Sequence, residues 1–100
     1  ELDDICSVEG IDIVFFGPGD FSHSIGRPGE ANHPEVLDAR RRVAEACKRN
    51  GRFCGAPASV DNAQELFDNG IQFLAIGADV IAIGQYYQDI HNGLQKKGLI

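Results

Sequence analysis

Three short runs of apolar residues divide the chain, and each ends in glycine or another small residue. The runs span residues 11–16, 53–56 and 73–76. Mostly apolar runs of this length, of which only the first contains a charged residue (Asp12), are typical of strands buried on both faces of a parallel sheet. We therefore expect three short buried strands, at Ile11 to Phe16, Phe53 to Ala56 and Phe73 to Ile76.

The segments between these runs show helical spacing. Apolar residues recur every three or four positions opposite a charged face: Val36, Ala39, Val43, Ala46 and Cys47. This pattern predicts an amphipathic helix over Glu35 to Asn50 that begins near Asn32, has Pro34 in its first turn and stops at Gly51.

Two shorter helical signals flank this pattern. The segment Asp61-Asn62-Ala63-Gln64 resembles a capping box and predicts a short helix that Gly70 ends. Residues 1–5 resemble the last turn of a helix.

The segment after residue 77 allows two interpretations. Apolar residues recur at helical spacing after a turn and N-cap signal at residues 77–79: Ile83, Tyr87, Ile90 and Leu94. In the alternative, Val80 to Ile83 form a fourth strand in a hairpin, and Gly84 ends it. The helical pattern explains more residues, so we expect a final helix that ends at Gly98.

Strands and helices therefore alternate, which implies parallel strands joined by right-handed crossovers. A (β/α)₈ barrel, the TIM barrel, uses ~31 residues per unit, so 100 residues hold about three of its eight units. Three such strands leave two open sheet edges. The sequence has no methionine and begins at Glu1, so we expect a chain that has been cut, processed or only partly represented.

Composition narrows the class of protein. The chain is 43% hydrophobic and 24% charged, as in ordinary soluble globular domains. Its net charge of -6 disfavours nucleic-acid binding. No apolar run approaches the ~20 residues that span a bilayer, and no leader opens the chain. Cys6, Cys47 and Cys54 are odd in number and lack C-x-x-C spacing, so we expect neither disulfides nor zinc, and a cytoplasmic location.

The segment Gly17-Pro18-Gly19-Asp20-Phe21-Ser22 directly follows the first predicted strand. The glycines allow a sharp turn and close approach of a ligand, and Asp20 would project from a loop held by a rigid scaffold. An ordinary corner with an Asx turn at Asp20 explains the same residues. The loop from Phe21 to His33 is the longest that the sequence predicts.

A wider set of motifs resembles the HpcH/HpaI aldolase family, which are metal-dependent pyruvate aldolases with a TIM-barrel fold. The most specific part is G-P-x-D-[LF]-S at residues 17–22, followed by H-P-E-V at residues 33–36. Gly51 with Phe53-Cys54-Gly55, and residues 70–80, continue the likeness. Two departures are mild: Gly19 stands where alanine is usual, and Phe21 where leucine is usual.

The resemblance implies an α/β fold in which residues 1–100 are the C-terminal three βα units of one barrel domain. It implies that Asp20 binds a divalent metal ion (Mg²⁺, Mn²⁺ or Co²⁺) together with a glutamate that lies before Glu1. The family's catalytic histidine and substrate-binding arginine would also precede Glu1, so no catalytic residue is expected in this segment. The implied substrate-binding residues are Gly19, Asp20, Ser22 and Ala56.

The resemblance also implies a reaction, the cleavage of a 4-hydroxy-2-oxo acid to pyruvate and an aldehyde, with the metal as Lewis acid. Backbone N–H groups near Gly19 and Asp20 can donate to the pyruvate carboxylate. Lys48, Lys96 and Lys97 fall on or beside solvent-facing helix positions, so this segment offers no strand-end lysine for a Schiff base. We expect a homo-oligomer, either a trimer or a hexamer.

Two other functions stay open. One is a citrate-lyase β-subunit or malyl-CoA-type lyase, and the other is a non-catalytic module that assembles through its open sheet edges. Four further polar residues have plainer interpretations than chemistry: His23 as a solvated loop residue, His33 as the start of a helix, Ser22 as a loop cap or a support for Asp20, and Asp79 as a helix N-cap. Cys54 fits a small buried hydrophobic residue.

Overall fold

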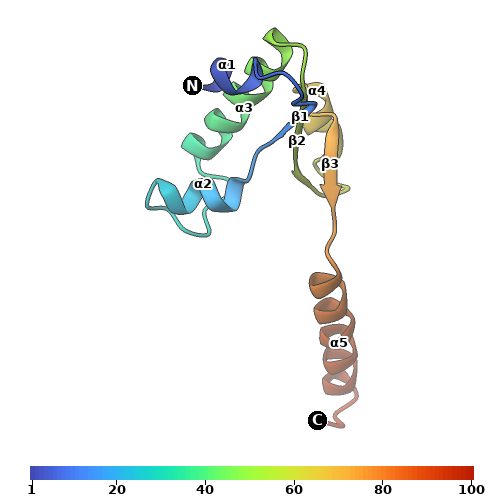
Figure 1. The fold of residues 1–100 in the computed structure, drawn as a ribbon. Helices are drawn as coiled ribbons and strands as arrows, with labels where there is room; N and C mark the ends of the chain where they lie inside the picture. The colour runs from blue at the N-terminus through green and yellow to red at the C-terminus, as the bar shows by residue number, and fades with distance from the viewer.

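The computed structural model describes all of residues 1–100 and confirms the alternation of strands and helices (Figure 1). The elements are α1 (Leu2–Cys6), β1 (Ile13–Phe15), α2 (Pro18–Ser24), α3 (Pro34–Arg49), β2 (Phe53–Ala58), α4 (Ala63–Asp68), β3 (Phe73–Ile76) and α5 (Asp79–Lys96). The three strands are parallel and form one sheet in the order β1-β2-β3. None of the helices is both long enough and apolar enough to cross a membrane.

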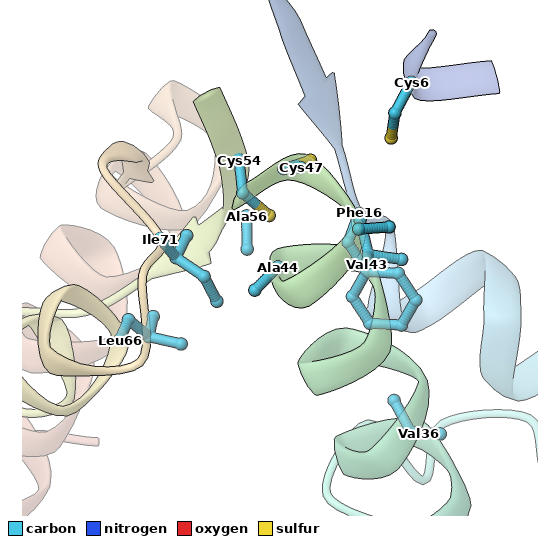
Figure 2. Close-up of a cluster of buried hydrophobic side chains, with 11 residues drawn as sticks. Cys6, Phe16, Val36, Val43, Ala44, Cys47, Cys54, Ala56, Leu66 and Ile71 are labelled. Carbon is cyan, nitrogen blue, oxygen red and sulfur yellow. The ribbon is translucent and has the colours of Figure 1, made fainter. Parts of the chain in front are cut away.

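One face of the sheet is covered by helices, and the core lies there (Figure 2). Cys54 and Ala56 of β2 point to this face and are 0% and 1% exposed. Side chains of α3 and α4 close over them. The cluster consists of Cys6, Phe16, Val36, Val43, Ala44, Ala46, Cys47, Cys54, Ala56, Leu66 and Ile71.

The opposite face of the sheet is not covered by any element of this chain. Its large side chains are Ile13, Phe15, Phe53 and Phe73, which are between 40% and 59% exposed. We call these four residues the uncovered face. Since parallel sheets are normally covered on both faces, this surface lacks its usual cover within this chain, as expected if the three strands are part of a barrel.

Helices α3 and α4 end in the same way, which returns the chain to the sheet. Each ends in Asn-Gly, at Asn50-Gly51 and Asn69-Gly70, and the glycines have φ of +67° and +84°. The residue after each glycine donates its N–H to the carbonyl oxygen five residues earlier. This is the hydrogen bond of a Schellman motif, in which glycine adopts the left-handed conformation without steric cost.

Helix α2 was not predicted, and it changes the setting of Asp20. Gly17 is the N-cap, Pro18 takes the first helical position and the helix continues to Ser24. Proline fits there because its fixed φ suits a helix and its missing N–H has no partner in the first turn. The predicted loop over residues 21–33 therefore shortens to residues 25–33, and Asp20 lies on a helix.

The strands and the capping of α4 also differ in detail from the prediction. β1 covers only residues 13–15, whereas β2 extends two residues further than expected, to Ala58. The capping box at residues 61–64 does not form. The Asn62 carboxamide instead accepts from Ser59 N at 2.8 Å, and the Ser59 hydroxyl accepts from Asn62 N at 3.3 Å.

The C-terminal segment forms the predicted helix, so the alternative of a fourth strand is wrong. None of the residues of α5 is buried, and the helix projects away from the sheet (Figure 1). The radius of gyration is 17.7 Å, whereas a compact chain of this length has about 13 Å. The elongated shape comes from α5, and the principal extents are 59 × 27 × 22 Å.

Candidate functional site

Asp20 lies in the first turn of α2, directly after the carboxyl end of β1. Its side chain is exposed, and none of the ion pairs of the chain involves it. The carboxylate folds back over Gly17, where an added Cβ would lie 3.2 Å from Asp20 Oδ2. Glycine at position 17 thus gives the carboxylate room beside the backbone.

The Asp20 side chain borders an open groove of about 340 Å³ along β1. The groove is lined mainly by apolar side chains: Val14, Phe15, Phe16, Gly17, Asp20, Phe21, Ser24 and Val43. The rings of Phe16 and Phe21 lie 5.7 Å apart, on either side of the Gly-Pro-Gly corner. No role was predicted for these two aromatic residues, although their positions on either side of the corner in the sequence were a signal that their rings could meet.

Two backbone donors point out of the start of α2 beside Asp20. The first hydrogen bond of the helix runs from Phe21 N to Gly17 O at 3.0 Å, and no side chain caps the helix. The N–H groups of Gly19 and Asp20 are therefore left free of helical partners. A Cβ at Gly19 would meet nothing within 4 Å, so alanine would fit at this position equally well.

Ser22 supports this turn from the protein interior. Its side chain is fully buried, and its hydroxyl donates to Gly19 O at 2.6 Å. Neither interpretation from the sequence matches this contact: Ser22 lies within α2, and its hydroxyl bonds a carbonyl oxygen of the first turn, neither capping the segment nor bonding the Asp20 carboxylate.

The Ala56 side chain points into the core and not toward Asp20. The methyl group lies in the core between sheet and helices, beside Cys54 (Figure 2). The structure therefore brings Gly19 and Asp20 together at one helix terminus, supports them with Ser22, and directs the Ala56 side chain elsewhere. The substrate-binding role of all four residues stays a prediction.

The remaining polar candidates have local structural roles. His33 is the N-cap of α3, and its Nδ1 accepts from Glu35 N at 3.2 Å, which confirms that it starts the helix. Asp79 is the first residue of α5 and not its N-cap, which is Ala78; its Oδ1 accepts from Val80 N at 2.7 Å. His23 is exposed on α2 and not on a loop.

The three cysteines are free thiols from α1, α3 and β2, and all are buried. Burial is the main cause that raises the pKa of Cys47 to about 12, and the neighbouring Cys54 and Cys6 add to it. Burial also raises the pKa of Cys54. Both thiols are therefore neutral at pH 7 and poor as nucleophiles or metal ligands, which confirms Cys54 as a small buried hydrophobic residue.

The side chains of this chain provide one suitable metal ligand, the Asp20 carboxylate. No three His, Cys, Asp or Glu side chains of this chain are grouped closely enough to hold a metal ion. The exposed carboxylate of Asp20 is nevertheless of the kind that hard divalent cations bind, since they accept one or two carboxylates and complete their coordination with other oxygen atoms.

The parallel sheet, its helix-covered face and the carboxylate that follows the first strand are typical of a segment of an α/β barrel. The family model described as HpcH/HpaI aldolase/citrate lyase matches residues 1–84. The chain belongs to this family.

Named relatives agree with this family. The hydroxypyruvate/pyruvate aldolase of Delftia acidovorans is 40% identical over 84 residues, which are 82% of this chain and 31% of the relative. The 2-keto-3-deoxy-L-rhamnonate aldolase of Escherichia coli K12 is 44% identical over 84 residues, 80% of this chain and 30% of the relative. The chain thus spans about a third of the length of the curated relatives that it matches.

A solved structure confirms the fold. The HpcH/HpaI aldolase from Desulfitobacterium hafniense DCB-2 matches 94% of this chain and 37% of its own, with 31% identity and a TM-score of 0.83. The predicted fold class is confirmed: the chain forms the C-terminal three βα units of a TIM barrel, with parallel strands.

Proposed function

We propose that this chain supplies the C-terminal part of a class II, divalent-metal-dependent pyruvate aldolase. The enzyme would cleave a 4-hydroxy-2-oxo acid to pyruvate and an aldehyde. The observation that carries the proposal is the Asp20 carboxylate, exposed in the first turn of α2 and outside every ion pair of the chain, at the groove beside β1. The aldolase names of the relatives support the reaction class.

Asp20 would hold Mg²⁺, Mn²⁺ or Co²⁺ together with ligands from outside this chain. When bound, such a cation supplies Lewis-acid polarisation of the substrate keto oxygen. The residues of this chain bind and orient the substrate. The free N–H groups of Gly19 and Asp20 donate to the substrate carboxylate, as backbone groups at a helix N-terminus do for anions.

Ser22 and Ala56 would act on the substrate less directly. The Ser22 hydroxyl holds Gly19 O, which shares its planar peptide unit with the Asp20 N–H, and so keeps that N–H group in place for the substrate. Because the Ala56 side chain is turned into the core, its contribution would come from its main chain on β2.

We also propose a cytoplasmic homo-oligomer, a trimer or a hexamer. Helix α5 has no buried residue, and Ile76 at the end of β3 is 51% exposed. A helix that follows a parallel strand normally packs back on its own sheet. Each copy therefore has an unpacked helix α5 and an uncovered surface beside β3. In a symmetric oligomer, α5 of one copy could pack beside β3 of another copy.

The test uses the complete protein that carries this chain, with the variant Asp20→Asn. Because the amide keeps the shape but loses the charge, we expect cleavage to fall by about 100-fold or more while the circular-dichroism spectrum is unchanged. The matched control is Asp61→Asn, which removes a carboxylate from an exposed turn and should retain activity.

Two reagents separate the mechanisms. We expect EDTA to abolish cleavage, and borohydride with pyruvate to leave it unchanged because no imine forms. Full activity of Asp20→Asn with added Mg²⁺ or Mn²⁺ would contradict the role of Asp20. Activity that survives EDTA but is lost with borohydride and pyruvate would contradict the whole mechanism.

A further inference from the structure

Gly55 lies at the centre of the sheet, between the two phenylalanines that lean toward each other over it. In the register of the parallel strands, Gly55 is the partner of Phe15 on one side and of Phe73 on the other. The two rings meet edge to face above it, with centroids 6.3 Å apart and planes at 79°. All three residues belong to the side of the sheet that carries the uncovered face.

The space above Gly55 is too small for any side chain. A Cβ built there would lie 2.7 Å from Phe15 Cδ2, 3.1 Å from Phe73 Cδ1 and 3.1 Å from Phe73 O. Carbon atoms in contact are normally 3.5–4.0 Å apart. Since the Phe73 oxygen is backbone, relief would have to come mainly from a shift of Phe15. Gly55 has no positive φ, so its conformation alone does not require glycine.

Gly55 also holds the end of β1 through its backbone. Phe16 N donates to Gly55 O at 2.8 Å, one residue after the last residue of β1. Gly17 follows immediately as the N-cap of α2, so only a few residues separate this hydrogen bond from Asp20. A shift of Phe15 would therefore move the start of α2 and the carboxylate that it carries.

We propose that Gly55 is a positioning residue for Asp20. Because Gly55 has no side chain, the ring of Phe15 can contact the ring of Phe73. This ring contact and the hydrogen bond from Phe16 N to Gly55 O together fix the end of β1, from which α2 starts. The inference rests on the proposed function, in which Asp20 binds the metal ion. Residues that orient metal ligands in this way typically change affinity by about 10- to 100-fold when they are altered.

The experiment measures Mn²⁺ binding by electron paramagnetic resonance in the complete protein, well below its unfolding temperature. We expect Gly55→Ala to weaken Mn²⁺ binding by about 10- to 100-fold while the protein remains folded. Phe15→Val removes the ring atoms that the new methyl group would meet, so Gly55→Ala/Phe15→Val should bind no more weakly than Phe15→Val alone. The matched control is Gly93→Ala, where a Cβ meets nothing within 4 Å, and wild-type affinity is expected.

Each of the other outcomes contradicts either the inference about Gly55 or the proposed function. If folded Gly55→Ala binds Mn²⁺ as tightly as wild type and is only less stable, Gly55 is structural and the inference is wrong. If Gly55→Ala does not fold, Phe15→Val alone decides, because loosening the ring contact should weaken Mn²⁺ binding several-fold, and unchanged affinity refutes the inference. If wild type neither binds Mn²⁺ nor cleaves substrate, the proposed function has failed and this inference with it.

Discussion

Helices α3 and α5 are similar in length and amphipathic pattern, but only one of them is packed. α3 has 16 residues and α5 has 18. Five residues of α3 are buried and the helix contacts β2, α1 and α2, whereas α5 buries none. The buried residues of α3 are Val36, Val43, Ala44, Ala46 and Cys47.

The two helices also differ in how they are anchored. α3 is capped by His33, and it is paired to its neighbours by Arg49 to Asp3 at 3.1 Å and by Arg40 to Glu65 at 3.2 Å. α5 has no side-chain cap, and its side-chain hydrogen bonds join residues of the same helix. An amphipathic pattern thus predicts that a helix has an apolar partner, but it does not identify the chain that supplies this partner.

The strongest test isolates the 100-residue chain. We expect it to be catalytically inert, because the other metal ligands are missing, and to self-associate through α5 and the open sheet edges. Sedimentation velocity and a pyruvate-release assay check both parts, with the complete protein as control. A monomer that turns over a 2-oxo acid contradicts the expectation.

The next test compares one leucine from each region in the complete protein. Leu66 is fully buried in the core that α3 closes, so Leu66→Ala should lower the free energy of unfolding by about 2–5 kcal/mol at every protein concentration. Leu94 of α5 is 36% exposed, and Leu94→Ala should cost about 0.5 kcal/mol in dilute solution.

If another copy covers α5, the cost of Leu94→Ala should increase with protein concentration, because folding is then linked to association. Urea unfolding at several concentrations measures both variants. If both variants lose the same free energy of unfolding at every protein concentration, the core and α5 do not differ in the way expected here.

A smaller effect is expected at alkaline pH, and only in the packed region. The pKa of Cys47 is raised to about 12 in the folded chain, mainly by burial. As the pH rises above the usual pKa of 9.0, the unfolded thiol ionises first, so the free energy of unfolding should fall between pH 9 and pH 12. Cys47→Ala should flatten this decline, which unfolding at pH 7 and pH 10.5 measures. An unchanged slope contradicts the assigned cause.

The smallest effect is expected at the surface that joins α1 to α3. Hydrogen bonds from Arg49 and then Asn50 lower the pKa of Asp3 below 3.8. The stabilisation is therefore present above pH 3.8 and is lost as the pH falls through the lowered pKa. Asp3→Asn should be slightly less stable than wild type at pH 7 and equal to it at pH 2. Added salt should reduce the difference, since the pair is exposed.

Periodicity and apolar runs were enough to predict most elements but not their surroundings. The limits of β3 match the prediction, and α3 and α5 follow from helical spacing. α2 was missed because Gly17-Pro18-Gly19 reads as a turn, although proline and glycine also suit the first helical position and the N-cap.

The site was predicted less completely than the fold. Asp20 was singled out because its motif follows a strand, but its role as a metal ligand stays a prediction, since no three His, Cys, Asp or Glu side chains of this chain are grouped to hold a metal ion. The direction of the Ala56 side chain depends on strand register, which composition does not reveal. Gly55 entered only as part of the family resemblance, and no role was predicted for it, because its need for glycine comes from two phenylalanines on neighbouring strands.

The sequential strand order β1-β2-β3 also has a consequence for the order in which the complete protein folds. Each strand pairs with the next one along the chain, with partners 40 residues apart between β1 and β2 (Ile13 and Phe53) and 18 apart between β2 and β3 (Gly55 and Phe73). These pairings close smaller loops than the pairing of β3 with a strand from the beginning of the barrel, so they cost less chain entropy. As the C-terminal units of a barrel, they leave the ribosome after the earlier strands of the barrel have been synthesised. We therefore expect barrel closure to be a late step, during which the phenylalanines of the uncovered face are exposed to chaperones until both sheet edges are paired.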